Sequence, residues 1–365
     1  MSQPNERKRK TASENEQAST EKDNDTKSAP RRKTPARRQS APAATKSKKA
    51  ASGIGSSTRG KILVTGAAGA LAQHVIALLK ENYDVIGVEF RGLQTDYPDT
   101  VDYVVDFNQW PFEDVFREHG FMGIIHLGRI RFTQSTRNRR YSANVVGTAR
   151  LLRLALKYGV EKVVAMSTFH VYGADARNPS LIDEEYPMRA ANLMPEVVDA
   201  VELENLFNIH LYKNPELNIT ILRPCNIAGP GINNEISRML AQPVVPCLFG
   251  FSPLMQFIHV EDMADAVVRS FERNHPGVYN VAPDDYVAYQ DALQLAGCRR
   301  LFLPSVPPAL ARRSVRALGR YAPPDYLIDF FKYAVIIDGG LFARTFDFTP
   351  QHSLADLLGH YRAHK

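Results

Sequence analysis

Short apolar runs recur along the chain from residue 61 onward, and segments with helical spacing separate them. Six runs predict β-strands, at 62–64, 83–89, 101–106, 122–127, 160–167 and 218–223. Two of the intervening segments predict helices, over 137–158 and 196–211, because their apolar residues fall on one helical face. Buried strands that alternate with helices are typical of a parallel sheet covered on both faces. The pattern therefore predicts an α/β, doubly wound parallel sheet.

The alternation loosens after Pro224, where 225–257 and 298–350 are rich in proline and aromatic residues. We expect one large domain over 61–365, in which 61–224 mainly binds a dinucleotide. Residues 225–365 would form a smaller C-terminal subdomain that mainly binds substrate and caps one edge of the sheet.

A glycine turn follows the first predicted strand, in the sequence Thr65-Gly-Ala-Ala-Gly. Gly66 permits a tight turn, and Gly69 lets the backbone approach a pyrophosphate closely. The first amides of the next helix then face the anion, so Ala68, Ala70 and Leu71 join the predicted cofactor site. This strand, turn and helix predict a Rossmann-type dinucleotide-binding fold.

The second predicted strand ends at Glu89, twenty residues after Gly69. An acidic side chain at that distance can accept hydrogen bonds from a ribose 2′-hydroxyl, which favours NAD. Arg91 follows two residues later and could pair with a 2′-phosphate, so NADP stays possible.

Charge divides the chain into two parts. Residues 1–60 hold fifteen Lys and Arg against six Asp and Glu, a net charge of +9, whereas the remainder carries −3. Met1 and Ile54 are the only large apolar residues of the first part, so we expect a disordered tail over 1–60. The tail either attracts a polyanion, such as nucleic acid or an anionic surface, or merely solvates the protein.

The remaining composition favours a cytoplasmic protein. No apolar run is long enough to span a bilayer, so no transmembrane segment is predicted. The three cysteines, Cys225, Cys247 and Cys298, show neither disulfide nor metal-ligand spacing, and we expect no bound metal.

Several segments, in order, resemble the extended short-chain dehydrogenase/reductase family, which includes nucleotide-sugar epimerases such as UDP-glucose 4-epimerase, dehydratases and reductases. The resemblance covers about 61–360. The segments are Thr65-Gly-Ala-Ala-Gly, Asp106, Ile125-His-Leu-Gly128, Asn144-Val-Val-Gly-Thr148, Ser167-Thr-Phe-His-Val-Tyr-Gly173, Leu222-Arg-Pro-Cys-Asn226 and Phe257-Ile-His-Val-Glu-Asp262.

The resemblance implies roles for individual residues. Asp106 would contact the adenine, and Gly128 would let the cofactor's phosphate and ribose pass. Thr168 would hold the substrate hydroxyl or carbonyl beside the nicotinamide. The same resemblance adds Phe107, Leu127, Asn144 and Ser167 to the cofactor site, adds Asn226 and Gln256 to the substrate site, and implies a homodimer.

This chain departs from the family's pattern at the acid/base pair. The resemblance expects a Tyr and, four residues later, a Lys, but the alignment places Glu196 and Ala200 there. Three explanations stay open: Glu196 itself transfers the proton; His170, Tyr172 or Tyr186 reaches the site; or the site has lost its chemistry and retains nucleotide binding.

Two functions follow from these alternatives. The first is an NAD(P)-dependent epimerase, dehydratase or reductase of a nucleotide-sugar or related hydroxyl or carbonyl substrate, with a non-standard acid/base. Gln256 stands where many such enzymes have a diphosphate-binding Arg, and the apolar segment 243–255 makes a hydrophobic substrate possible. The second is a catalytically degenerate NAD(P)-binding scaffold or redox sensor whose basic tail binds a polyanion.

Overall fold

The computed structural model describes residues 45–46, 59–90, 97–130, 135–190, 194, 197–303 and 327–365. All of them belong to one compact unit, residues 43–365. The predicted disordered tail over 1–60 therefore lies almost wholly outside the described residues, as do Arg91 and Glu196. The predicted domain boundaries stay predictions.

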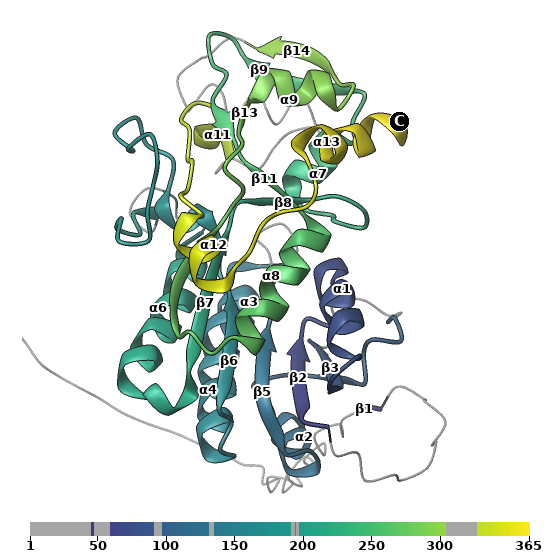
Figure 1. The fold of residues 1–365 in the computed structure, drawn as a ribbon, viewed down its shortest axis with the longest axis vertical. Coiled ribbons are helices and arrows are strands. Elements are labelled where there is room, and N and C mark those ends of the chain that lie inside the picture. The colour runs from purple at the N-terminus through teal and green to yellow at the C-terminus, as the bar shows by residue number, and fades with distance from the viewer. Residues whose placement is uncertain are drawn as a thin grey trace, which may run out of the picture. The chain divides into compact units, whose positions relative to one another are not determined.

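A parallel sheet of seven strands forms the centre of this unit (Figure 1). Its strands are β2 (Lys61–Thr65), β3 (Asp84–Phe90), β4 (Tyr103–Val105), β5 (Phe121–His126), β6 (Lys162–Met166), β7 (Ile219–Pro224) and β12 (Gly277–Val281). They lie in the order β4-β3-β2-β5-β6-β7-β12, and β1 (Thr45–Lys46) pairs antiparallel with β4. The strand order reverses at β2, which is where doubly wound sheets bind their ligands. The Rossmann-type fold prediction is confirmed.

Helices cover both faces of the sheet, as the buried strands require. On one face α1 (Ala70–Leu79) packs against α8 (Val260–Glu272), which crosses in front of the strands in Figure 1. The opposite face is covered by α2 (Pro111–Glu118), α4 (Gly147–Lys157) and α6 (Val198–Lys213). Along β2, Ile62 and Val64 join the first core, and Leu63 joins the second, because successive side chains point to opposite faces.

The predicted helix over 137–158 exists, but a π-helical turn divides it. The three parts are α3 (Arg137–Tyr141), η2 (Ser142–Val146) and α4. Such turns insert an extra residue and re-aim the side chains around them, often at functional sites. Here the turn contains Asn144, a predicted cofactor residue.

Apart from α8, β12 and the helix over 340–346, which belong to the main sheet or pack on it, the described residues after 224 form small sheets and short helices beyond the carboxyl ends of the main strands (Figure 1). The paired strands are β8 (Asn226–Ala228) with β11 (Phe257–His259), β9 (Val244–Leu248) with β14 (Arg299–Leu303), and β10 (Leu254–Met255) with β13 (Val287–Ala288). The helices are α7 (Glu235–Leu240), α9 (Tyr289–Leu295), α11 (Leu327–Phe330), α12 (Gly340–Phe346) and α13 (Leu354–Ala363), and the 3₁₀ turns η3 (Phe169–Tyr172) and η5 (Pro215–Leu217) lie earlier in the chain. The sequence pattern missed β12, which adds to the main sheet from this half.

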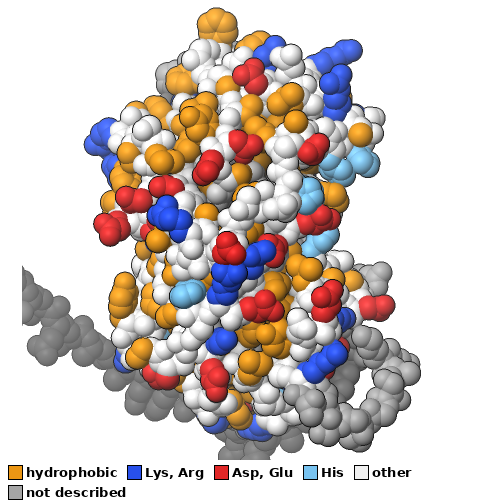
Figure 2. Space-filling model, viewed as in Figure 1, with side chains coloured by type: hydrophobic (Ala, Val, Ile, Leu, Met, Phe, Trp, Pro, Cys, Tyr) orange, Lys and Arg blue, Asp and Glu red, His pale blue; other side chains and the backbone are white. Residues whose placement is uncertain are grey.

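The surface of the described residues carries mixed charge. Figure 2 shows acidic and basic side chains interspersed on the face that carries α8 and α12. None of the helices in the described ranges combines the length and apolar composition needed to cross a bilayer.

Candidate functional site

A cavity of about 560 Å³ opens at the carboxyl ends of β2, β3, β5 and β6. Most of the residues predicted from the sequence line it: Gly66, Ala68, Gly69, Ala70, Leu71, Glu89, Phe107, Leu127, Gly128, Asn144, Ser167, Thr168, His170 and Asn226. Its volume lies within the usual range of ligand-binding pockets. The fold thus brings residues from 66 to 226 to one site.

The glycine turn forms one wall of the cavity. Gly66 has φ +72°, and a Cβ built there would lie 2.6 Å from the Cα of Gly128, so only glycine fits this crossing of two chains. Gly69 begins α1, whose first turn contains no acidic side chain. Ala70 and Leu71 at this helix start line the cavity, where the positive end of the helix dipole suits a pyrophosphate.

Glu89 ends β3 on one side of the glycine turn. Its two carboxylate oxygens accept hydrogen bonds from the backbone N–H groups of Ala68, at 3.1 Å, and Phe90, at 2.8 Å. Burial raises the pKa of Glu89, and these two hydrogen bonds oppose that shift. The carboxylate is thus oriented where a ribose diol would donate to it.

Beneath the turn, His126 connects β2 to α4. Its Nδ1 lies 2.7 Å from Thr65 Oγ1, and its Nε2 lies 3.0 Å from Thr148 Oγ1. Burial lowers the pKa of His126 to about 4, so the ring is neutral at physiological pH. This histidine supports the floor of the site and does not line the cavity.

Thr168 and His170 lie together at the carboxyl end of β6. Thr168 Oγ1 lies 2.8 Å from His170 Nδ1 and also accepts the backbone N–H of His170 at 3.3 Å. Burial, and secondly the cation of Arg129, lower the pKa of His170 to about 3. A neutral imidazole therefore stands next to the hydroxyl that the sequence predicts to hold the reacting oxygen.

Ser167 is oriented by a buried ionic network. It donates a short hydrogen bond to Glu204, whose other oxygen accepts Arg223 Nε at 2.8 Å. Arg223 also donates to the hydroxyl of Tyr172 at 2.8 Å. These contacts cannot be read from the spacing of the sequence, because they join residues up to fifty-one positions apart.

Tyr172 does not line the cavity. Its side chain is fully buried, and its hydroxyl donates to Asn280 Oδ1 at 2.7 Å. Burial raises the pKa of Tyr172 to about 12, which does not favour proton transfer at neutral pH. Tyr186 donates to Asn178 at 3.2 Å, also outside the lining.

Two other residues predicted for the site make hydrogen bonds that support the surrounding loops. Asp106 accepts hydrogen bonds from Asn108 N and Gln109 Nε2, at 2.9 and 3.1 Å, within its own turn. Gln256 is buried and contacts the backbone of Pro283 and Ile337. Neither lines the cavity. Asn226 does line it, and its side-chain amide donates a hydrogen bond to the backbone carbonyl of Gln256 at 2.9 Å.

Asp199 lines the cavity and was not predicted from the sequence. It lies in the first turn of α6, and Ala200, which we predicted from the sequence to take the family's Lys position, is buried beside it. Asp199 Oδ2 accepts hydrogen bonds from Arg140 Nε at 3.1 Å and Asn144 Nδ2 at 2.8 Å. The sequence offered one signal for a role of Asp199 in the site: an acid stands one position before the expected Lys.

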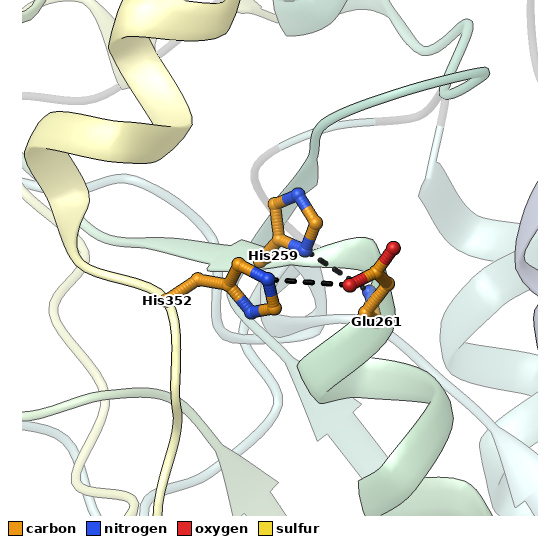
Figure 3. Close-up of side chains that lie close together, drawn as sticks. All are labelled: His259, Glu261 and His352. Atoms are coloured by element: carbon orange, nitrogen blue, oxygen red, sulfur yellow. Dashed lines mark hydrogen bonds and ion pairs between the residues drawn. The ribbon is translucent and has the colours of Figure 1, made fainter.

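A second cluster, formed by His259, Glu261 and His352, lies outside the cavity (Figure 3). The two imidazole rings stack with their centres 3.8 Å apart and their planes at 20°. Nearly parallel rings direct their nitrogens along separate planes, not at one ion. The nitrogens of His352 face Glu261 Oε2 at 3.2 Å and Asp262 Oδ1 at 3.1 Å. The arrangement connects the segment before α13 to the start of α8.

The cavity, its glycine turn and its acidic β3 end can be compared with known proteins. The model of the NAD dependent epimerase/dehydratase family matches residues 62–282. This chain belongs to that family. The family description confirms the predicted type of cofactor, NAD, and places the chain among epimerases and dehydratases at the coarse level.

Individual relatives are more distant. An uncharacterized protein of Mycobacterium tuberculosis is 30% identical over 155 residues, which are 42% of this chain and 41% of that protein. The chain thus spans about two fifths of the length of the first curated relatives that it matches. UDP-glucose 4-epimerase of Caenorhabditis elegans is 27% identical over 258 residues, 58% of this chain and 73% of the enzyme.

Solved structures share the fold. A Thermus thermophilus UDP-glucose 4-epimerase in complex with NAD has a TM-score of 0.67 at 18% identity, covering 83% of this chain and 98% of the other. A Bacillus cereus UDP-glucuronic acid 4-epimerase, in complex with UDP-glucuronic acid and NAD, has a TM-score of 0.64 at 20% identity, with the same coverage.

Proposed function

We propose that this protein binds NAD in the cavity and acts as an epimerase, dehydratase or reductase on a nucleotide-activated sugar. The observation that carries the proposal is the continuity of the cavity from the glycine turn and Glu89 to Thr168 and His170. The half at the glycine turn suits the adenosine and pyrophosphate of a dinucleotide, and the other half places a hydroxyl and an imidazole beside the remaining space. The family and the UDP-sugar epimerases that resemble the chain support the substrate class.

Different residues of the chain would bind different parts of the cofactor and the substrate. The amides of Ala70 and Leu71 at the start of α1 would hold the pyrophosphate, and the Glu89 carboxylate would accept hydrogen bonds from the adenosine ribose. When NAD is bound, its nicotinamide supplies the hydride chemistry. Thr168 holds the reacting oxygen of the substrate close to that ring.

His170 orients the Thr168 hydroxyl in this proposal, because a ring whose pKa burial lowers to about 3 is a weak proton acceptor at neutral pH. With its proton on Nε2, the ring accepts a hydrogen bond from the Thr168 hydroxyl through Nδ1. Of the other residues that the sequence offers as the acid/base, Tyr172 is hydrogen-bonded to Asn280 and Arg223. Glu196 lies outside the described residues.

Turnover by the purified full chain tests the proposal. We expect bound or added NAD to become reduced, or an isomerised or dehydrated sugar to form, with at least one of UDP-glucose, UDP-glucuronic acid, dTDP-glucose and GDP-mannose. Absorbance of reduced nicotinamide and chromatography of the sugar nucleotides measure the two outcomes. NAD binding without any turnover across this panel contradicts the catalytic part.

That outcome would favour the second candidate, a nucleotide-binding scaffold or redox sensor. The resemblance supports it, because aligning the chain with the family's motif places Glu196 and Ala200 at the Tyr and Lys positions, and Ala200 is buried. In this candidate the basic segment 1–60 binds a polyanion, so deleting it abolishes salt-sensitive binding to DNA or anionic vesicles. Binding that survives the deletion removes the tail from the function. Homodimer formation also stays a proposal, and the size of the protein in solution tests it.

A further inference from the structure

Asp199 presents an oriented carboxylate to the cavity. Its side chain is 10% exposed, and Oδ2 takes both hydrogen bonds, from Arg140 and Asn144. Oδ1 accepts no hydrogen bond from any of the residues that the structure describes. The carboxylate therefore has one oxygen fixed from behind and one with acceptor capacity left for a ligand.

The groups behind Asp199 are themselves fixed. Asn144 exchanges two hydrogen bonds with the backbone of Ile130, each 2.8 Å long, and the π turn η2 carries it to this position. Arg140 is buried, with 4% of its side chain exposed, and balances the charge of Asp199. Desolvating two charges is costly, so such a pair is weak evidence for stability and better suited to holding an acceptor in place.

The position of Asp199 in the sheet order indicates which ligand group it meets. A dinucleotide whose pyrophosphate lies over the turn after β2 extends toward β3 on one side and toward β5 and β6 on the other. Glu89 stands on the β3 side. Asp199, Asn144 and Ile130 line the opposite half, with Thr168. The second nucleoside of the ligand lies in that half.

We propose that Asp199 binds the ribose hydroxyls of the nicotinamide half of the cofactor, as Glu89 does for the adenosine half. The proposal rests on the proposed NAD binding. A ribose diol carries two O–H donors, and a carboxylate oxygen is the acceptor that suits them. Asp199 is a positioning residue: by fixing the ribose it sets where the nicotinamide lies relative to Thr168. The chain would thus hold this ribose without a Lys at position 200.

A series of ligands tests the proposal on the full chain by calorimetry. ADP contains the adenosine half and pyrophosphate, ADP-ribose adds the second ribose, and NAD adds the nicotinamide. We expect Asp199→Asn to weaken ADP-ribose and NAD binding about tenfold, the scale of one charge-assisted hydrogen bond, and to leave ADP unchanged. Glu89→Gln is the matched control and weakens all three ligands alike.

Unchanged ADP affinity also shows that the variant is folded. If Asp199→Asn does not fold, the wild-type protein gives the answer: ADP-ribose lacking the 2-hydroxyl of its terminal ribose should bind about tenfold more weakly than ADP-ribose. Equal affinities for the two compounds, or equal weakening of ADP and ADP-ribose by Asp199→Asn, overturn the proposal. No binding of ADP or NAD to the wild-type protein overturns the proposed function as well, and so separates the two failures.

Discussion

At the scale of single residues, the site depends on side chains whose partners fix their orientation before any ligand arrives. Glu89 is held by two backbone amides, and Thr168 by a histidine two positions away. Such preorganisation reduces the entropy lost on binding and is the reason for expecting large effects from small substitutions.

Replacing Glu89 should change cofactor preference. Glu89→Gln removes the charge that favours a ribose diol and repels a 2′-phosphate, so NAD affinity should fall about tenfold and the preference over NADP should shrink. Calorimetric titration with both cofactors measures this. Glu81→Gln, an exposed acid just beyond α1, is the control and should leave both affinities unchanged. A variant that keeps its wild-type preference removes Glu89 from the ribose site.

Replacing Thr168 should affect turnover more than binding. Thr168→Val deletes the hydroxyl that contacts His170 and that we propose to hold the reacting oxygen, so kcat should fall by about 10² or more. Thr168→Ser keeps the hydroxyl and should retain most of the activity. NAD affinity, measured separately, should be the same in both variants. Full activity of the valine variant would contradict the assigned role.

At the scale of elements, Asp262 ties the C-terminal segment to α8. The carboxylate, buried in the first turn of α8, accepts the backbone N–H groups of Gln351 at 3.0 Å and His352 at 3.1 Å. It also contacts the His352 ring, which stacks on His259 (Figure 3). This contact fixes the entry of α13, which otherwise follows a loop.

We expect Asp262→Ala to lower the free energy of unfolding by about 1–3 kcal/mol, because two amides and an imidazole lose their acceptor. Denaturant unfolding measures the change. Asp265→Ala, which removes only the surface pair with Arg269 one turn later, should cost less than about 1 kcal/mol. Equal losses in the two variants would show that the connection to 351–352 contributes nothing.

At the scale of the whole molecule, buried histidines make stability depend on pH. His126 and His170 have pKa values lowered to about 4 and about 3 by burial, against an ordinary value of 6.5. The unfolded chain therefore binds more protons than the folded chain between these values. Stability is complete above pH 6.5 and falls as the pH drops toward the folded pKa values.

For His126 alone, the lost stability should be of the order of 3 kcal/mol by pH 4. His126→Gln should lower stability at pH 7 to 8, where it loses hydrogen bonds with Thr65 and Thr148, but should flatten the slope between pH 6.5 and 4. Denaturant unfolding across this range gives the slope. His364→Gln, at the exposed C-terminal end, is the control. An unchanged slope in the His126 variant would contradict a neutral buried ring.

The sequence by itself determined six of the seven parallel strands and the glycine turn with its acidic neighbour. Apolar runs, the glycines at 66 and 69 and the acid at 89 act locally, so spacing along the chain was enough to place them. Tertiary structure decided the rest, because the deciding contacts join distant residues. Asp199 gained its position from Arg140 and Asn144, more than fifty positions earlier. Tyr172 and Gln256 have side chains that could act in the site, but both are buried and hydrogen-bonded to residues distant in the sequence, so they support the fold instead.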